Sequence, residues 1–211
     1  MNVGILGSGD VAKALAKGFL ARGDSVMLGT RDSSKLDDWR ASAGERASVG
    51  SFAQTAQFGE WIVLATLGTA TEDVIAQAGL AHFNGKLVID TTNPLSFDGG
   101  VVSLAYVDPS NGERVARALP NARVVKAFNT VGNALMVHAD FHGPRGVMFI
   151  AGDDGEAKSA VADLCREWNW EPSDMGGIDA SGYLEAMCIV WVRHAAAMQQ
   201  WNSAFTFVAA N

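Results

Sequence analysis

The sequence predicts a doubly wound α/β fold of the Rossmann type, with a mainly parallel sheet and a short C-terminal helical appendage. Short apolar runs alternate with amphipathic stretches along the chain, as in repeated βαβ units. The run 61–65 is apolar without interruption, which is typical of a strand covered on both faces. The first apolar run leads directly into a glycine-rich turn and then a helical pattern.

The elements follow from the spacing of apolar residues. Val11, Leu15 and Phe19 recur at helical spacing, and Gly23 marks the end of that helix. The expected strands are residues 3–6, 26–28, 61–65, 87–90, 123–127 and 147–151. The expected helices are residues 11–20, 33–43, 71–78, 111–118, 156–168 and 182–198.

Two stretches interrupt this pattern. Residues 93–110 contain two prolines and a Gly-Gly pair and are expected to form a loop. Residues 174–182 are rich in Gly, Asp and Ser and are taken as a boundary. The chain is therefore expected to consist of a main α/β domain, residues 1–175, and a C-terminal segment, residues 176–211, for capping or dimerisation.

Composition limits the class of protein. The 16 basic and 23 acidic side chains give a formal net charge of −7, which does not favour binding to nucleic acid or to an anionic membrane. Two cysteines in apolar helical patterns fit a reducing, cytoplasmic setting. We expect no signal peptide and no membrane-spanning segment.

The first turn has the pattern expected of a dinucleotide-binding site. It reads Gly7-Ser8-Gly9-Asp10-Val11-Ala12, which is G-x-G-x-x-A between a strand and a helix. Gly7 permits the tight turn, Gly9 lets a pyrophosphate approach the backbone, and Ala12 lets the helix pack closely on the strand. The helix N-terminus then offers N–H groups to the phosphates. The alternative is a glycine turn that binds nothing.

The end of the second strand indicates which nicotinamide cofactor is bound. NAD-preferring domains place an acid there, but this chain has Gly29 and Thr30 followed by Arg31. Arg31 and Lys35 supply positive charge for a 2′-phosphate, and Thr30 and Ser33 supply hydroxyls. The prediction is NADP(H), with NAD bound through Asp32 as the alternative.

Three later strand ends carry small polar residues. In an open α/β sheet the ligand lies across the carboxyl ends of the strands, so these loops are candidate contacts for cofactor or acceptor. Turn formation alone would also favour such residues. The candidates from these loops are Thr66, Leu67, Gly68, Asn93, Pro94 and Asn129.

Several catalytic motifs are missing from the sequence. It contains no Tyr-x-x-x-Lys pair, no HExxH and no CxxC, so we expect no metal. His138 and His142 are four residues apart, but Gly143-Pro144 favours a loop over a metal-binding helix. Only Lys126 and Asn129 lie where a general acid is needed, and no catalytic residue is assigned. Hydride transfer to a planar redox cofactor requires less help from side chains.

Five runs of sequence together resemble a known family. They are GILGSGDVAKALAKGFLARGDSVMLGTRD, WIVLAT, DTTNPL, VVKAFNTVG and FIAGDDGEAKSAVADLCREW. Their order and spacing resemble the F420-dependent NADP oxidoreductase family. They are also similar to the cytosolic NADPH domain of six-transmembrane metalloreductases.

The resemblance implies NADP contacts at Ser8, Gly9, Asp10, Val11, Thr30, Arg31, Lys35, Thr66, Leu67, Gly68, Asn93, Pro94 and Ala127. It implies hydride exchange between NADPH and the deazaflavin ring of F420 without an essential acid or base. It also implies a homodimer that involves the C-terminal segment. The first turn departs from the family's frequent Gly-Gly-Thr-Gly, and no set of F420 contacts can be matched.

Three functions stay open at this point. The expected one is an NADPH-dependent oxidoreductase that exchanges a hydride with F420, FMN, FAD or a similar small-molecule two-electron acceptor. The second is a reductase of a small carbonyl or imine, although such enzymes attach a helical domain of ~100 residues or more that the short segment 176–211 does not provide. The third is a non-catalytic NADPH-binding sensor.

Overall fold

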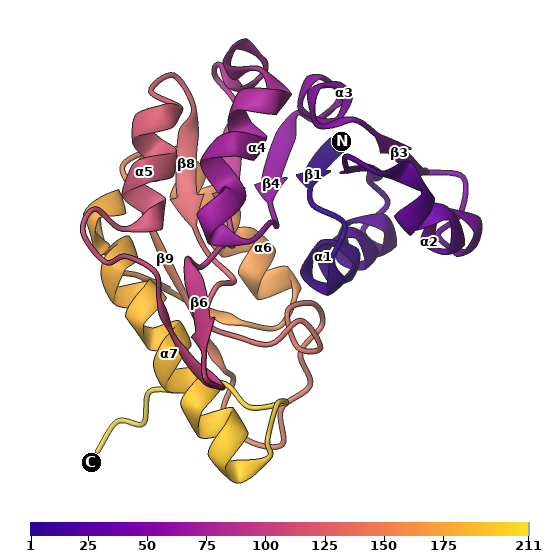
Figure 1. The fold of residues 1–211 in the computed structure, drawn as a ribbon. Coiled ribbons are helices and arrows are strands. Elements are labelled where there is room, and N and C mark those ends of the chain that lie inside the picture. The colour runs from indigo at the N-terminus through magenta and orange to yellow at the C-terminus, as the bar shows by residue number, and fades with distance from the viewer. Residues whose placement is uncertain (211) are drawn as a thin grey trace.

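An eight-stranded sheet forms the centre of the protein (Figure 1). This computed structural model describes residues 1–210. The sheet order is β10-β9-β8-β5-β4-β1-β2-β3. The strands are β1 (Asn2–Leu6), β2 (Ser25–Gly29), β3 (Ala47–Gly50), β4 (Trp61–Leu64), β5 (Leu87–Asp90), β8 (Arg123–Lys126), β9 (Val147–Gly152) and β10 (Glu171–Asp174). The Rossmann-type fold predicted from the sequence is confirmed.

The chain order reverses between β1 and β4. From β3 to β8 every neighbouring pair is parallel, so the carboxyl ends of these six strands lie along one edge of the sheet. Ligands of open α/β sheets bind at such a reversal point. β9 pairs antiparallel with β8, and β10 pairs parallel with β9.

Helices cover both faces of the sheet. The helices are α1 (Asp10–Ala21), α2 (Asp37–Ser42), α3 (Phe52–Phe58), α4 (Thr71–Ala78), α5 (Asn111–Ala118), α6 (Gly155–Glu167) and α7 (Ser181–Met198). Phe19 of α1 and Trp168 after α6 pack in the core on one face, with ring centroids 5.1 Å apart. Val74 of α4 and Val115 of α5 belong to the core on the other face. Burial of these apolar faces is the main stabilising contribution.

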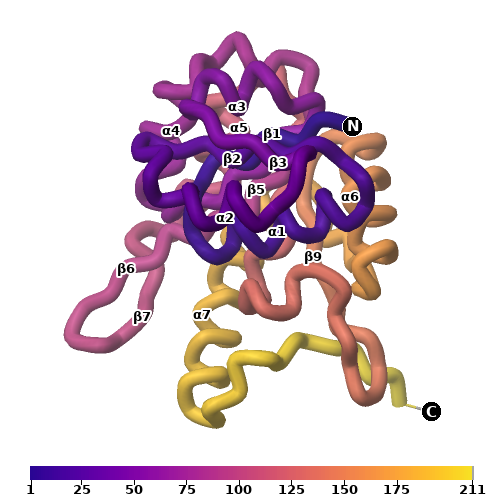
Figure 2. Tube along the Cα trace, turned by 90° about the vertical axis from the view of Figure 1, so that its right-hand side faces the viewer, coloured from indigo at the N-terminus to yellow at the C-terminus, as the bar shows by residue number. Residues whose placement is uncertain are grey.

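The stretch 93–110, expected as a loop, contains a hairpin. β6 (Leu95–Asp98) pairs antiparallel with β7 (Val101–Leu104). Gly99 and Gly100 both have positive φ, the requirement of the tight two-residue turn that joins such strands. The expectation of a loop over residues 93–110 is therefore wrong for the two strands, and Gly99 and Gly100 form the turn between them. Figure 2 shows the hairpin extending away from the main sheet.

Other local differences have simple causes. β3 and α3 were not predicted, although Ser51 and Gln54 form the capping box that begins α3. β10 was missed because Pro172 and two acids hide its pattern. The expected helix 33–43 is divided into a 3₁₀ turn, Ser33–Leu36, and α2.

The C-terminal part returns to the sheet. Leu184 of α7 is buried against Val147 and Phe149 of β9. Beyond α7, the Phe205 carbonyl accepts a hydrogen bond from Val147 N (2.8 Å). Within residues 1–210, no helix combines the length and the apolar character needed to span a membrane.

Candidate functional site

A cleft of about 620 Å³ lies at the carboxyl ends of β1, β2, β4 and β5. We call it the strand-end cleft. It brings together many of the predicted contacts, namely Gly7, Ser8, Gly9, Asp10, Val11, Thr30, Arg31, Lys35, Thr66, Leu67 and Asn93. It is also lined by Gly29, Asp32, Phe52, Ala65, Ala70, Asp73, Val74, Gln77, Thr91, Thr92, Leu95 and Asn133. Residues from distant parts of the sequence therefore meet here, as the fold class requires.

Five predicted contacts do not line this cleft. Ser33 is exposed, and Ala127 is completely buried at the end of β8. Gly68 lies beneath the cleft, where its N–H donates to the Asn93 carbonyl (3.0 Å). Pro94 follows Asn93, and the buried Asn129 donates through Nδ2 to Asn93 Oδ1 (2.9 Å). Gly68 and Asn129 thus hold a cleft residue in place.

The glycine turn meets the steric demands of a phosphate-binding loop. Gly7 has φ +148°, and a Cβ there would overlap the Ala65 carbonyl oxygen. A Cβ on Gly9 would meet no protein atom within 4 Å. Gly9 is also the N-cap of α1 and provides no side chain to cap its first N–H groups. The open space and the uncapped N–H groups lie together, which suits a pyrophosphate.

At the Arg31 end of the cleft, the side chain of Asp32 is hydrogen-bonded within its own turn. Asp32 Oδ1 accepts hydrogen bonds from Ser34 Oγ (2.6 Å) and Ser34 N (3.1 Å). The bond from the Ser34 hydroxyl lowers the pKa of the Asp32 carboxyl. The Thr30 hydroxyl in turn accepts from Asp32 N (3.2 Å). This turn leaves the cationic side chains of Arg31 and Lys35 on the same cleft.

The opposite end of the cleft is formed by the segment after β5. Thr91 Oγ1 donates to the Leu64 carbonyl (2.8 Å), and the Asn93 side chain donates to the Asn129 carbonyl (2.9 Å). Thr92 donates to Asp90 Oδ1 through both its backbone N–H and its hydroxyl. The side chains of this segment are therefore held in fixed orientations.

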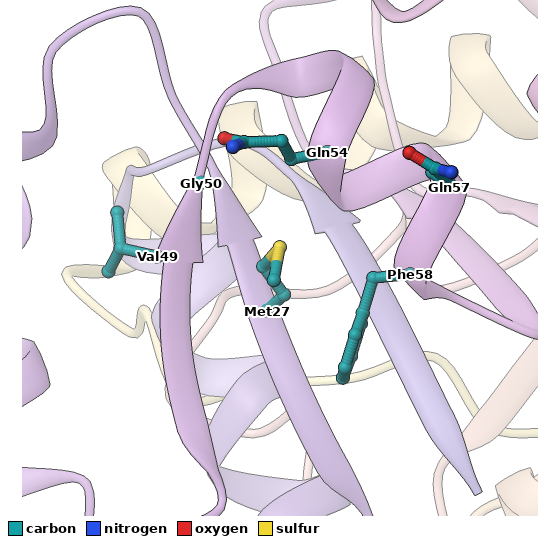
Figure 3. A pocket seen from close by; sticks show the side chains of 6 residues that line it. All are labelled: Met27, Val49, Gly50, Gln54, Gln57 and Phe58. Atoms are coloured by element: carbon teal, nitrogen blue, oxygen red, sulfur yellow. The ribbon is translucent and has the colours of Figure 1, made fainter.

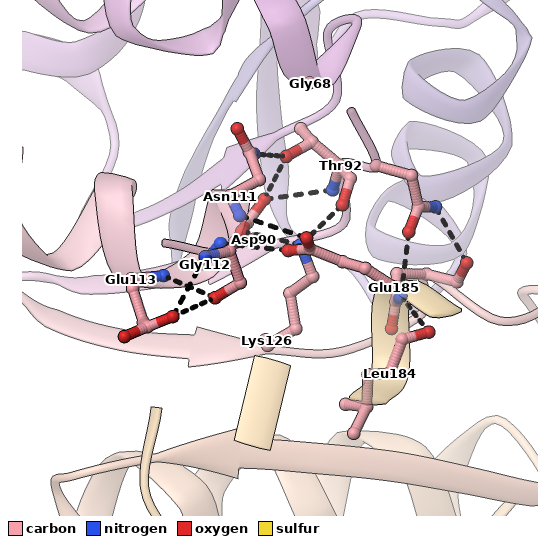
Figure 4. A network of polar contacts seen from close by, with 12 residues as sticks. Gly68, Asp90, Thr92, Asn111, Gly112, Glu113, Lys126, Leu184 and Glu185 are labelled. Atoms are coloured by element: carbon pink, nitrogen blue, oxygen red, sulfur yellow. Dashed lines mark hydrogen bonds and ion pairs between the residues drawn. The ribbon is translucent and has the colours of Figure 1, made fainter. Parts of the chain in front are cut away.

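Behind Thr92 lies a buried set of charges that we call the Lys126 cluster: Lys126, Asp90, Glu185, Thr92 and Asn111 (Figure 4). Lys126 Nζ donates to Asp90 Oδ2 (3.0 Å), Glu185 Oε1 (2.8 Å) and the Thr92 carbonyl. All three charged side chains are fully buried. Burial alone would lower the pKa of Lys126, but the two carboxylates outweigh it and raise that pKa. Lys126 therefore stays protonated.

Part of this arrangement was not foreseen from the sequence. The sequence predicts Lys126 as a candidate acid, but its motifs do not indicate Glu185 or Asn111. Glu185 lies on α7 and accepts hydrogen bonds from the N–H groups of Asn111 (3.0 Å) and Gly112 (2.9 Å) at the start of α5. A signal for it did exist, because Glu185 is an acid within a run of mostly apolar residues, and buried acids require partners.

A second hollow offers no comparable chemistry. It has a volume of about 290 Å³ and lies over β2, β3 and α3 (Figure 3). Its lining is Met27, Val49, Gly50, Gln54, Gln57 and Phe58, none of which titrates. His138 and His142 lie in a stretch without helix, and no group of three potential metal ligands occurs in the part of the chain that the structure describes.

The fold and the strand-end cleft together define a Rossmann-type dinucleotide-binding protein. The family model described as "NADP oxidoreductase coenzyme F420-dependent" matches residues 2–94. A crystal structure of a provisional F420-dependent NADP reductase from Arthrobacter sp. FB24 superimposes with a TM-score of 0.92 at 30% identity, covering 98% of this chain and 99% of that one. The chain belongs to the F420-dependent NADP oxidoreductase family, as the resemblance implied.

Two curated relatives cover most of this chain. The F420-dependent NADP reductase of Methanothermobacter marburgensis is 26% identical, with 88% of each chain covered. Rat metalloreductase STEAP3 is 31% identical over 88% of this chain. The chain spans only 36% of the length of that metalloreductase. Both relatives are named as reductases.

Proposed function

We propose that this chain is an NADPH-dependent oxidoreductase that exchanges a hydride between NADP(H) and a deazaflavin of the F420 type. The observation that carries the proposal is the strand-end cleft, which joins a phosphate-binding turn, two cationic side chains and the segment after β5. Bound NADPH would supply a hydride, that is, a proton with two electrons. The family and the Methanothermobacter relative support NADP(H), and their names support F420 as the partner cofactor.

Each part of the cleft has a proposed task. Gly7, Ser8, Gly9, Asp10 and Val11 would hold the pyrophosphate at the N-terminus of α1. Thr30, Arg31 and Lys35 would bind the 2′-phosphate, with Ser33 as a neighbouring hydroxyl. Asp32 Oδ1 already accepts two hydrogen bonds from Ser34, and the cationic side chains of Arg31 and Lys35 on the same cleft favour the 2′-phosphate of NADP. The contacts at the strand ends would be Thr66, Leu67 and Asn93, with Gly68 and Asn129 holding Asn93 in place.

At the β5 end of the strand-end cleft, the side-chain protons are already donated to protein oxygens. This favours an acceptor that needs no acid from the protein. Lys126 donates to three acceptors, and the hydroxyls of Thr91 and Thr92 both donate to protein oxygens. Reduction of a carbonyl normally requires a proton donor at the oxygen. A deazaflavin ring accepts the hydride when the two rings are held face to face.

One assay tests the proposal. The protein is mixed with NADPH and, separately, with F420, FMN, FAD, riboflavin or small carbonyls and imines, and absorbance at 340 nm is followed. Oxidation of NADPH with F420 is expected. Turnover with carbonyls or imines alone would replace the proposal by a carbonyl or imine reductase. Tight NADPH binding without any turnover would point to a sensor.

We also propose a homodimer formed through α7. Tyr183 and Val190 are 75% and 57% exposed on a helix whose other side is buried, and Ala186 lies between them on the exposed side. An apolar face of this kind is typical of an interface. Light scattering should give twice the monomer mass, and Val190→Asp should give the monomer mass. A wild-type monomer would refute this arrangement.

A further inference from the structure

The Lys126 cluster contains one more acid than base. Asp90 Oδ1 accepts from Thr92, and Asp90 Oδ2 accepts from Lys126. Glu185 Oε1 accepts from Lys126 and Gly112, and Oε2 accepts from Asn111. Every carboxylate oxygen thus faces a donor, which leaves no acceptor for a carboxylic acid proton. With every oxygen hydrogen-bonded in this way, the two carboxylates and Lys126 carry a formal net charge of −1.

The start of α5 offsets only part of this charge. Glu185 receives the first two N–H groups of α5, whose end is equivalent to about half a positive charge. No other cationic side chain forms an ion pair with Asp90 or Glu185 among residues 1–210. Since the cluster is fully buried, water screens the remaining negative charge weakly.

The net negative charge of the Lys126 cluster lies at the β5 end of the strand-end cleft. Arg31 and Lys35 belong to the side of β2, whereas Thr92 belongs to the side of β5, across β1 and β4 in the sheet order. If the proposed function holds, a 2′-phosphate at Arg31 places the nicotinamide ring of NADP toward Thr92. Thr92 is hydrogen-bonded to Asp90 and Lys126, and Lys126 in turn pairs with Glu185 (Figure 4).

We propose that the net negative charge of Asp90, Glu185 and Lys126 shifts the bound cofactor pair toward its oxidised form and so makes the site a hydride donor. The transfer oxidises NADPH to NADP⁺ and reduces the deazaflavin by two electrons, and the deazaflavin takes its additional proton from water. The nicotinamide ring is neutral in NADPH and carries a positive charge in NADP⁺. A fixed negative charge therefore stabilises NADP⁺ selectively.

The test compares the dissociation constants of NADP⁺ and NADPH, measured by calorimetry without any acceptor. The wild type should bind NADP⁺ more tightly than NADPH. Glu185→Gln and Asp90→Asn each remove one negative charge, and each should raise the ratio Kd(NADP⁺)/Kd(NADPH) on the order of tenfold, the effect of one unit charge acting over about 10 Å at an effective dielectric constant near 20.

Glu113→Gln is the matched control. Glu113 lies in the first turn of α5, the helix that begins at Asn111, but outside the Lys126 cluster. Glutamine at this position preserves the capping box with Ser110. Its ratio should equal that of the wild type. A purely structural defect would weaken both cofactors equally and leave the ratio unchanged, and melting curves report whether each variant is folded.

The outcomes separate this inference from the proposed function. If the wild type binds neither NADP⁺ nor NADPH, the proposed function fails. If both bind but the wild type prefers NADPH, or the ratio stays constant in the folded variants, only the inference is overturned. The ratio Kd(NADP⁺)/Kd(NADPH) of the wild type by itself shows which form of the cofactor is preferred. The inference therefore remains testable even if a variant does not fold.

Discussion

Replacing Lys126 by methionine should strongly destabilise the protein. The change removes the cation between Asp90 and Glu185, which lie 3.0 and 2.8 Å from it and are fully buried. Breaking a buried ion pair from one side costs about 3–5 kcal/mol, because an uncompensated charge is left behind. For a chain of this size each kcal/mol lowers Tm by about 2–4 °C, so the expected decrease is about 6–20 °C.

The pH dependence of this effect has a definite sign. Burial would lower the pKa of Lys126, but the two carboxylates outweigh it and hold that pKa above its ordinary value of 10.5. A group whose pKa is raised on folding contributes stability that is present below its ordinary pKa and lost as pH rises through the raised value. The variant should therefore differ most from wild type below pH 10.5 and approach it at higher pH. Calorimetric melting of both proteins from neutral to alkaline pH measures the difference.

Lys158→Met provides the matched control. Lys158 also pairs with an acid, Asp174 at 2.9 Å, but the acid is half exposed. An ion pair of this kind contributes about 0–1 kcal/mol, so its loss should change Tm by only a few degrees. If the decrease in Tm of Lys126→Met is no larger than that of Lys158→Met, the reasoning that Lys126 stabilises the two buried carboxylates is refuted.

Three further predictions concern other parts of the chain. Gly9→Ala should fold normally but bind NADPH at least tenfold more weakly, since its Cβ points into open cleft, whereas Gly7→Ala should lower Tm because its Cβ overlaps Ala65. Arg31→Ala should weaken NADPH binding by about 10–150-fold, the loss of a charge-assisted hydrogen bond, with little effect on NADH, and the exposed Arg40→Ala should change neither. At Asp24, burial would raise the carboxyl pKa, but Arg22 and the N-terminal amine outweigh it and lower that pKa. Its stabilising effect is therefore present above the ordinary pKa of 3.8 and lost as pH falls through the lowered value, so Asp24→Asn should be destabilised at pH 7, and its difference from wild type in urea titrations should shrink as pH falls below 3.8.

The sequence predicted those parts of the fold that local patterns determine. The glycine turn and the buried strands were recognisable because each depends on neighbouring residues. The hairpin of β6 and β7 was missed because its strands are largely exposed and lack the apolar runs by which buried strands are recognised. Glu185 was missed for a different reason. Its partners Lys126 and Asn111 lie 59 and 74 residues away in the sequence, and only the packing of α7 brings them together.

The Lys126 cluster also bears on which acceptors suit the site. Reduction of a carbonyl develops negative charge on a single oxygen next to the nicotinamide, and a buried net negative charge opposes that development. Loss of hydride from NADPH develops positive charge on the nicotinamide itself, which the same charge favours. An acceptor that spreads its new electrons over a large conjugated ring is opposed least. If the proposed function holds, the arrangement of Asp90, Glu185 and Lys126 thus supports a deazaflavin over a carbonyl on electrostatic grounds, separately from the engaged protons of Lys126, Thr91 and Thr92.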